Sequence, residues 1–302
     1  MNDLVSLPVW FLVLMCIFAV VGLTDRIFAP SVKWFFRRKA NKAIEELNTR
    51  LRLRIQPFKT TRRQALIDRV LFDPEVIKAI EVEAQDTKTP RTVMQAKAER
   101  YAREIVPAFN AYAYSAIGTR VARWASTFVY RVRLGYANDE SLAGIDPEAT
   151  VVFVMNHRSN MDYVLVTYLA SASATLSYAV GEWARIWLLQ SIIRAMGAYF
   201  VRRDSGNLLH RRVLARYVAM ATQSGVTQAI FPEGGLSRDG NLRDPKFGLL
   251  SYMVDGFNKE TSRDIVFVPV GLNYDRVLED RMLTSARDKK IGEKSFPVGI
   301  RQ

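Results

Sequence analysis

Cysteine and histidine are scarce in this chain of 302 residues, which has one cysteine, Cys16, and two histidines, His157 and His210. A single cysteine excludes an intrachain disulfide and offers no thiolate cluster for a metal. We find no repeat of fixed period and no low-complexity tract. Hydrophobic residues make up 49% and charged residues 24% of the chain, which excludes disorder as its overall state.

Acidic residues are outnumbered, with 30 Asp and Glu against 43 Lys and Arg, for a net charge of +13. The excess lies almost entirely between Thr24 and Arg133, where 23 Lys and Arg face 11 Asp and Glu. A basic segment of this kind predicts a phosphate-rich partner, either nucleic acid or an anionic membrane surface.

Charge is absent from Leu4 to Leu23, a run of 20 residues that is long enough to cross a bilayer as a helix. A signal peptide is the alternative, but the run lacks a basic start and a small-residue cleavage site close behind it. Basic residues follow the run, so the positive-inside rule predicts an N-terminal membrane anchor with the catalytic region in the cytoplasm. Aromatic residues interleave with them, as at a headgroup interface: Trp34, Phe35 and Phe36.

Three regions are expected: a membrane anchor over 1–24, a basic, membrane-proximal helical region over 25–128, and an α/β domain over 129–302. In the second region helix-forming residues dominate 32–54 and 61–82, with a new helix start at Asp73-Pro74. Residues 86–91 indicate a loop, and further helices are expected over 92–106 and 108–128. A solvated basic linker beyond Asn48 is the alternative to a membrane-facing one.

From residue 129 onward strand-like and helix-like segments alternate. The stretch FVYRVRLGY beginning at Phe128 has the alternation of a strand. Further strands are expected at Thr150–Met155, Thr175–Val180, Ala198–Val201, Thr227–Phe231 and Asp264–Leu272. Helices fit between them at Asp162–Ala170, Glu182–Met196, Leu208–Gln223 and Pro245–Phe257. This order predicts an α/β fold with a mixed, largely parallel sheet flanked by helices. In such a fold the functional residues are expected in the loops that follow the strands.

The segment after the first of these strands reads N-H-R-S-N-M-D, with His157 and Asp162 five residues apart. Histidine accepts a proton near neutral pH, as an attacking alcohol requires, and a carboxylate on its other ring nitrogen would stabilise the imidazolium. Helix capping by Asp162 is the structural alternative. His210 lies in a polar L-H-R-R context that predicts a solvated surface residue, which leaves His157 as the candidate base.

Two further loops carry groups suited to phosphate. After the fourth strand, F-P-E-G-G-L-S-R supplies Glu233, Gly234, Gly235, Ser237 and Arg238, with Lys246 downstream. Paired glycines allow a ligand close to the backbone, and hydroxyl and guanidinium groups bind phosphate. A tight turn with solvated charges is the alternative, and Glu233 fits best as a structural partner of an arginine. Arg202 and Arg203 end the third strand, where alternation places only one on the site's face.

Four blocks in this order resemble the motifs of the glycerolipid acyltransferase family: His157-R-S-N-M-Asp162, G-A-Y-F-V-R-R, F-P-E-G-G-L-S-R and V-P-V-G-L-N-Y-D-R. The glycerol-3-phosphate acyltransferase branch is the most similar. The resemblance implies that His157 is the general base, Asp162 its partner, and that the acceptor phosphate contacts Arg202, Arg203 and the third block with Lys246. It places Pro269 in the acyl-donor region, with acyl-CoA or acyl-carrier protein as co-substrate. It implies no metal and no resident cofactor.

The resemblance implies acylation of the 1-hydroxyl of glycerol 3-phosphate, with lysophosphatidate as product. Lysophosphatidate acylation is the nearest rival, and dihydroxyacetone phosphate is a third acceptor. Leu236 departs from the third block, which weakens a fine assignment of substrate. The chain ends soon after the fourth block, where many relatives continue, so we expect a shortened C-terminus.

Two interpretations compete outside these motifs. The apolar face of 182–196, with Trp183 and Trp187, fits a wall for the acyl chain or a core helix covering the sheet. A non-enzymatic membrane- or nucleic-acid-binding protein would use the basic helices instead. We expect no nucleic acid, because the adjoining apolar run favours membrane lipid as the partner.

Overall fold

The structure is a computed structural model that describes residues 53–279 apart from 172–173, 182–186, 203–205, 238–239 and 256, with scattered positions between 8 and 51. The expected anchor at 4–23 therefore lies largely outside the described residues. Within the expected helix at 32–54, the positions that are described between 34 and 49 are helical. None of the helices that the structure describes is long and apolar enough to cross a membrane.

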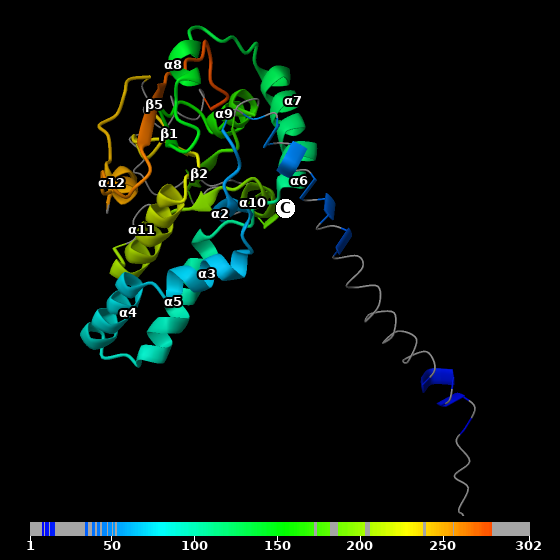
Figure 1. Cartoon of the computed structure of the whole chain (residues 1–302), viewed down its shortest axis with the longest axis vertical. Helices are drawn as coiled ribbons and strands as arrows, with labels where there is room; N and C mark the ends of the chain where they lie inside the picture. The colour runs from blue at the N-terminus through cyan, green and yellow to red at the C-terminus, as the bar shows by residue number, and fades with distance from the viewer. Residues whose placement is uncertain are drawn as a thin grey trace, which may run out of the picture.

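The centre of the fold is a five-stranded sheet in the order β3-β2-β4-β1-β5 (Figure 1). The strands are β1 (Thr150–Met155), β2 (Ser177–Val180), β3 (Tyr199–Phe200), β4 (Gln228–Ile230) and β5 (Ile265–Val270). All the pairings between described strands are parallel, so the expectation of a mixed sheet was wrong. The strand expected at FVYRVRLGY was also wrong, because 130–138 has no regular structure.

Helices surround the sheet and precede it in the chain. The first group comprises α2 (Pro57–Thr60), α3 (Arg63–Leu71), α4 (Pro74–Asp86), α5 (Arg91–Ile105), α6 (Ala111–Ala113), the π-helix η1 (Tyr114–Gly118) and α7 (Thr119–Val129). The second comprises α8 (Asp139–Ala143), α9 (Asp162–Ala170), α10 (Trp187–Ala195), α11 (Leu208–Gln223) and α12 (Gly248–Val254). The predictions for β1, α9 and α11 are confirmed to the residue.

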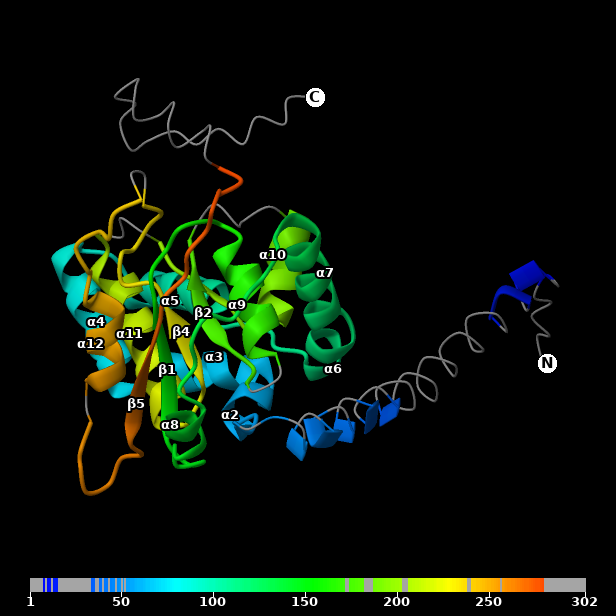
Figure 2. The same ribbon diagram turned by 90° about the horizontal axis from the view of Figure 1, so that it is seen from above.

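Both faces of the sheet are covered, which explains why β1 is an almost unbroken apolar run. Val152 and Val154 on one face pack with α11, α12 and helices α3, α4 and α5. Phe153 and Met155 on the other face pack with α9. Figure 2 shows these helices on opposite sides of the strands. The helices before residue 106 therefore share a core with the α/β part.

Lys59 on α2 links the N-terminal helices to the sheet through hydrogen bonds in the protein interior. Its ammonium group is buried and donates hydrogen bonds to the carbonyls of Thr175 (2.8 Å) and Leu176 (3.0 Å), just before β2. It also lies 4.5 Å from the ring centroid of Phe109. Burial lowers the pKa of Lys59 well below its ordinary value.

His210 corrects a second expectation, because it is buried and not a solvated surface residue. It lies in the first turn of α11 and its ring meets that of Tyr101 on α5 edge-to-face, with centroids 5.1 Å apart. The flanking arginines suggested a polar surface, but α11 is enclosed between the sheet and α4–α5.

Candidate active site

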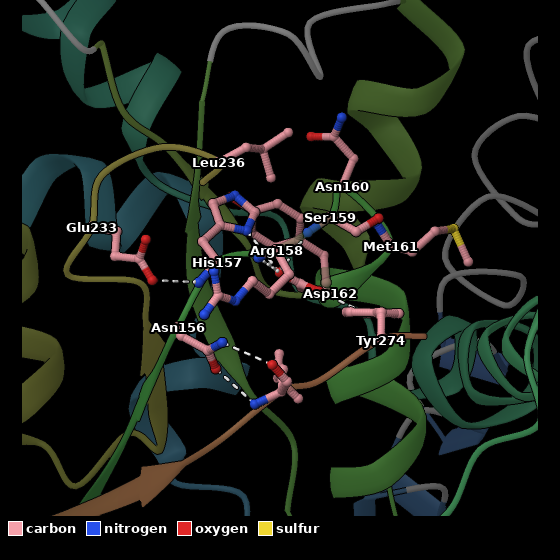
Figure 3. Close-up of polar contacts among 12 residues, drawn as sticks. Asn156, His157, Arg158, Ser159, Asn160, Met161, Asp162, Glu233, Leu236 and Tyr274 are labelled. Carbon is pink, nitrogen blue, oxygen red and sulfur yellow. Dashed lines mark hydrogen bonds and ion pairs between the residues drawn. The ribbon is translucent and has the colours of Figure 1, made fainter. Parts of the chain in front are cut away.

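Three loops that follow adjacent strands meet at the carboxyl edge of the sheet. They follow β4, β1 and β5, which are neighbours in the strand order. Asn156 joins two of them, because its side chain donates to the Leu272 carbonyl (2.8 Å) and accepts from the Leu272 amide (2.6 Å) (Figure 3). The loops after β1 and β5 are thereby held in register at the point where the polar residues gather.

His157 and Asp162 form a buried hydrogen-bonded pair. His157 lies in the loop after β1, and Asp162 is the first residue of α9. The distance from His157 Nδ1 to Asp162 Oδ2 is 2.9 Å, and the two residues are 2% and 0% exposed. A carboxylate on Nδ1 leaves Nε2 as the nitrogen that can accept a proton from an acceptor hydroxyl.

Asp162 is fixed by donors on both carboxylate oxygens. Oδ2 also accepts from the backbone amides of Arg158 (2.7 Å) and Ser159 (3.1 Å), while Oδ1 accepts from the hydroxyl of Tyr274 (2.6 Å) (Figure 3). Burial and the neighbouring Asp162 carboxylate raise the pKa of Tyr274, so this hydroxyl stays protonated and remains a donor. Asp162 thus both orients His157 and closes the turn into α9.

Aromatic rings enclose the imidazole of His157. Phe231 after β4 lies at 4.5 Å between ring centroids, and Tyr163 on α9 lies edge-on at 5.3 Å. The Tyr163 hydroxyl is 3.5 Å from His157 Nε2, at the long limit of a hydrogen bond. These rings hold the imidazole in place and limit the access of water to it.

Glu233 braces the backbone of the site. Its Oε1 accepts from the His157 amide (3.1 Å) and its Oε2 from the Arg243 amide (3.2 Å). The sequence favoured an arginine side chain as the partner of Glu233. An arginine is one of its two partners, but it is the backbone amide of Arg243 that donates and not a guanidinium. Since both oxygens are engaged and the residue is buried, this placement gives no support to an acceptor contact through Glu233.

The paired glycines lie beside His157, within reach of a lysine. Gly234 has φ +63°, a conformation that favours glycine, and a Cβ there would lie 3.0 Å from Cδ of Lys246. The Ser237 amide donates to the His157 carbonyl (3.0 Å), and its hydroxyl donates to the Asn241 carbonyl (2.7 Å). Gly235 is buried in the same turn, and Arg238 lies outside the described residues.

Two further predicted positions, Arg202 and Pro269, are engaged elsewhere in the fold. Arg202 donates to both carboxylate oxygens of Glu104 (3.0 and 2.7 Å) and lies over the ring of Tyr101, so it is held against α5. Arg203 lies outside the described residues. Pro269 lies in β5, pairs with Val154 of β1, and lines the groove described below.

Sequence reasoning missed several residues that build the site. Tyr274 donates directly to Asp162, and Asn156 joins the loops after β1 and β5 through Leu272. Glu279 accepts from the Ser159 hydroxyl (2.8 Å) and the Asn160 amide (3.0 Å). Their partners lie more than 100 positions away in the chain, so no local pattern could reveal them. The only sequence signal for Tyr274 was its place in the V-P-V-G-L-N-Y-D-R block.

A large apolar groove runs from this site along one face of the sheet. Its volume is about 1620 Å³, and Tyr274 lies in its lining. The walls are β1, β5, α9, the loop 271–278 and the segment 129–142. The groove was not predicted, because its walls come from segments that lie far apart in the chain.

Among the residues that the structure describes, no group of His, Cys, Asp and Glu is placed to hold a metal ion.

Residues 136–273 match the model of the Acyltransferase family. The chain is 32% identical over 249 residues to the glycerol-3-phosphate acyltransferase of Xylella fastidiosa strain M23, which covers 79% of this chain and 27% of that protein. It is 34% identical over 225 residues to the enzyme of the same name from Pseudomonas entomophila strain L48, covering 72% and 27%. The resemblance in the four motif blocks is thereby confirmed.

This chain spans about a quarter of the length of these curated relatives. Among solved structures, the crystal structure of the 1-acyl-sn-glycerophosphate (LPA) acyltransferase from Thermotoga maritima matches 58% of this chain and 74% of that chain. The identity is 18% and the TM-score 0.35.

Proposed function

We propose that this chain transfers a fatty acyl group from a thioester, acyl-CoA or acyl-carrier protein, to the 1-hydroxyl of glycerol 3-phosphate. The observation that carries the proposal is the buried His157–Asp162 pair at the carboxyl edge of a parallel sheet. The names of the curated relatives support the acceptor. They also favour an enzyme over a protein that only binds membranes or nucleic acid.

The proposed reaction needs one base and one mobile proton. His157 Nε2 takes the proton of the acceptor hydroxyl as its oxygen attacks the thioester carbonyl carbon. Asp162, hydrogen-bonded to Nδ1, stabilises the imidazolium that forms. The carbon–sulfur bond then breaks, and the imidazolium returns the proton to the leaving thiolate, so the products are the ester and a free thiol.

The acceptor phosphate and the acyl chain would occupy different parts of the site. Lys246, folded over Gly234 beside His157, offers a cation for the phosphate. The apolar groove that begins at Tyr274 has the character needed for an acyl chain. We propose Arg203 and Arg238 as further phosphate contacts, because they fall on the family's motif positions. Arg202, already paired with Glu104, is the weaker candidate.

We further propose that the reaction takes place on the cytoplasmic side of a membrane to which the apolar run Leu4–Leu23 anchors the chain. The length of that run and the basic residues behind it support this location.

The test is acyl transfer in detergent from a labelled long-chain acyl thioester, with glycerol 3-phosphate or lysophosphatidate as acceptor. We expect product from glycerol 3-phosphate with the wild type and none with His157→Ala. His210→Gln serves as the histidine control, and its melting temperature must be compared with that of the wild type because His210 is buried. Activity with lysophosphatidate alone would leave the mechanism standing and refute the acceptor. Equal activity in His157→Ala would refute the mechanism.

A further inference from the structure

The outward face of two consecutive helical segments, η1 and α7, is an apolar stripe that no described element covers. Four large side chains at spacings of four, three and four residues form it, and they are 53–77% exposed: Ile117, Val121, Trp124 and Phe128. The rings of Trp124 and Phe128 stack with centroids 5.4 Å apart. Ala122 and Ser126, on the opposite side of the helix, are buried where α7 packs against α9. A contiguous exposed stripe of this kind marks an interaction surface.

The charged residues in the segment that carries the stripe are all positive. Between Glu104 and Asp139 the chain has no aspartate or glutamate, and its charged residues are Arg120, Arg123, Arg131 and Arg133. All four are exposed. An apolar helix face with tryptophan and arginine at its border is the pattern of a helix that lies in a membrane interface. A second copy of this chain would bring arginines against arginines, which argues against self-association.

The stripe adjoins the apolar groove at the C-terminal end of α7. Its C-terminal residue Val129 and the following residues 130–138 line the apolar groove. Within this segment Leu134 and Tyr136 are also strongly exposed. Figure 2 shows α7 beside α9 and α10. An apolar surface that continues into an apolar groove would let an acyl chain pass between a bilayer and the groove without crossing water.

We propose that this stripe, formed by Ile117 of η1 and by Val121, Trp124 and Phe128 of α7, docks on a bilayer that contains anionic lipid. The aromatic and aliphatic side chains enter the interface, and the arginines contact the headgroup phosphates. This docking is separate from the anchor proposed at 4–23 and does not depend on which acceptor is acylated.

The test places a reporter on α7 in the full chain. On a Cys16→Ser background, Val121→Cys or Phe72→Cys is labelled with an environment-sensitive fluorophore. Phe72, in the turn between α3 and α4, is the exposed control. The labelled proteins are reconstituted with vesicles of phosphatidylcholine, alone or mixed with phosphatidylglycerol. Some vesicles carry lipids brominated along the acyl chains, which quench a probe only where it enters the bilayer.

We expect the probe at 121 to shift to the blue and to be quenched in vesicles that contain phosphatidylglycerol, while the probe at 72 is not. Arg120→Gln/Arg123→Gln should lower the docking equilibrium constant by about thirtyfold, since each basic residue near an anionic surface contributes about fivefold. The exposed pair Arg69→Gln/Arg100→Gln is the matched charge control and should leave docking unchanged.

Three results would overturn the proposal. The first is an unquenched probe at 121 in anionic vesicles, and the second is equal quenching at 121 and 72. The third is a blue shift at 121 that needs no lipid and grows with protein concentration, which would identify the face as a contact between copies. Acyl transfer measured in detergent is a separate readout, so loss of docking with retained activity distinguishes this proposal from the proposed function.

Discussion

The carboxylate of Asp162 accepts four hydrogen bonds, of which only the one from His157 involves the proposed base. The other three come from two backbone amides and Tyr274. An asparagine could reproduce most of this arrangement, because its carbonyl oxygen can replace Oδ2 and its amide group can donate to the Tyr274 oxygen. The side chain at this position can therefore lose its charge without losing its geometry, which separates two roles of the aspartate.

Asp162→Asn should fold normally but lose about 10²-fold in kcat, because the imidazolium loses its counter-charge while the tautomer of His157 is preserved. Asp162→Ala removes the geometry as well and should cost at least tenfold more. Steady-state kinetics with glycerol 3-phosphate, together with thermal melts of both variants, check this. Equal losses in the two variants would show that the charge alone accounts for the role of Asp162, and an unimpaired Asp162→Asn variant would show that the geometry alone does.

Tyr274 acts on the base through Asp162, which makes it a positioning residue. Tyr274→Phe removes one donor from the carboxylate, so Asp162 becomes a stronger acceptor toward His157 and favours the imidazolium. We expect a loss of about tenfold in kcat, with the acid limb of the pH–rate profile displaced to higher pH. Tyr168→Phe, on the outer part of α9, is the matched control. A fall in kcat with an unmoved acid limb would contradict this role.

Among the elements, the junction of α4, α5 and α11 depends on one carboxylate. Glu83 on α4 accepts from Lys97 on α5 (2.7 Å), from the Asn207 side chain (2.9 Å) and from the Leu209 amide at the start of α11 (3.1 Å). Burial alone would raise the pKa of Glu83, but these donors outweigh burial and lower it. Glu83 therefore adds stability that is present above the ordinary glutamate value and is lost as the pH falls through its own lower pKa.

Glu83→Gln should lower the free energy of unfolding by about 2 kcal/mol at pH 7, because the buried donors lose a charged acceptor. The difference from the wild type should shrink as the pH falls below 4.5, the ordinary value for glutamate. Urea unfolding at several pH values measures it. Glu81→Gln, which breaks only an exposed ion pair with Arg91, should cost less than about 0.5 kcal/mol. A pH-independent difference would exclude this linkage.

Sequence patterns predicted the positions of helices and strands that have a regular composition. They did not predict features that depend on contacts with residues far away in the chain. The bounds of α11 were predicted to the residue, and the structure shows the Asn207 side chain capping its start by accepting from the His210 amide. The burial of α11 was not predicted, because His210 is enclosed by Tyr101, which lies more than 100 positions earlier in the chain. Residues 130–138 alternate like a strand, yet they cover the groove and do not pair with the edge strand β5. The bond from Arg202 to Glu104 is equally invisible to a local pattern.

At the scale of the whole molecule, the groove links the parts that the sequence left separate. Positions 151, 153 and 155 of β1 share one face, and their register partners 266, 268 and 270 on β5 face the same way. Met155 and Val270 lie at the end nearest His157, while Val151 and Val266 lie about 13 Å farther along the strands. If the acyl chain occupies the groove, its methyl end reaches these distant positions only when the chain is long.

A bulky side chain should therefore have different effects on the acyl specificity at the two ends of the groove. Val266→Trp obstructs the distant end and should abolish transfer of long acyl chains while short ones are still transferred. Val270→Trp obstructs the end nearest His157 and should reduce transfer at every chain length. The measurement is kcat/KM for a series of saturated acyl thioesters, with melting curves to exclude unfolded variants. If a folded Val266→Trp variant keeps the chain-length profile of the wild type, the acyl chain lies elsewhere. The groove would then remain without an assigned ligand, although the proposed base at His157 would be unaffected.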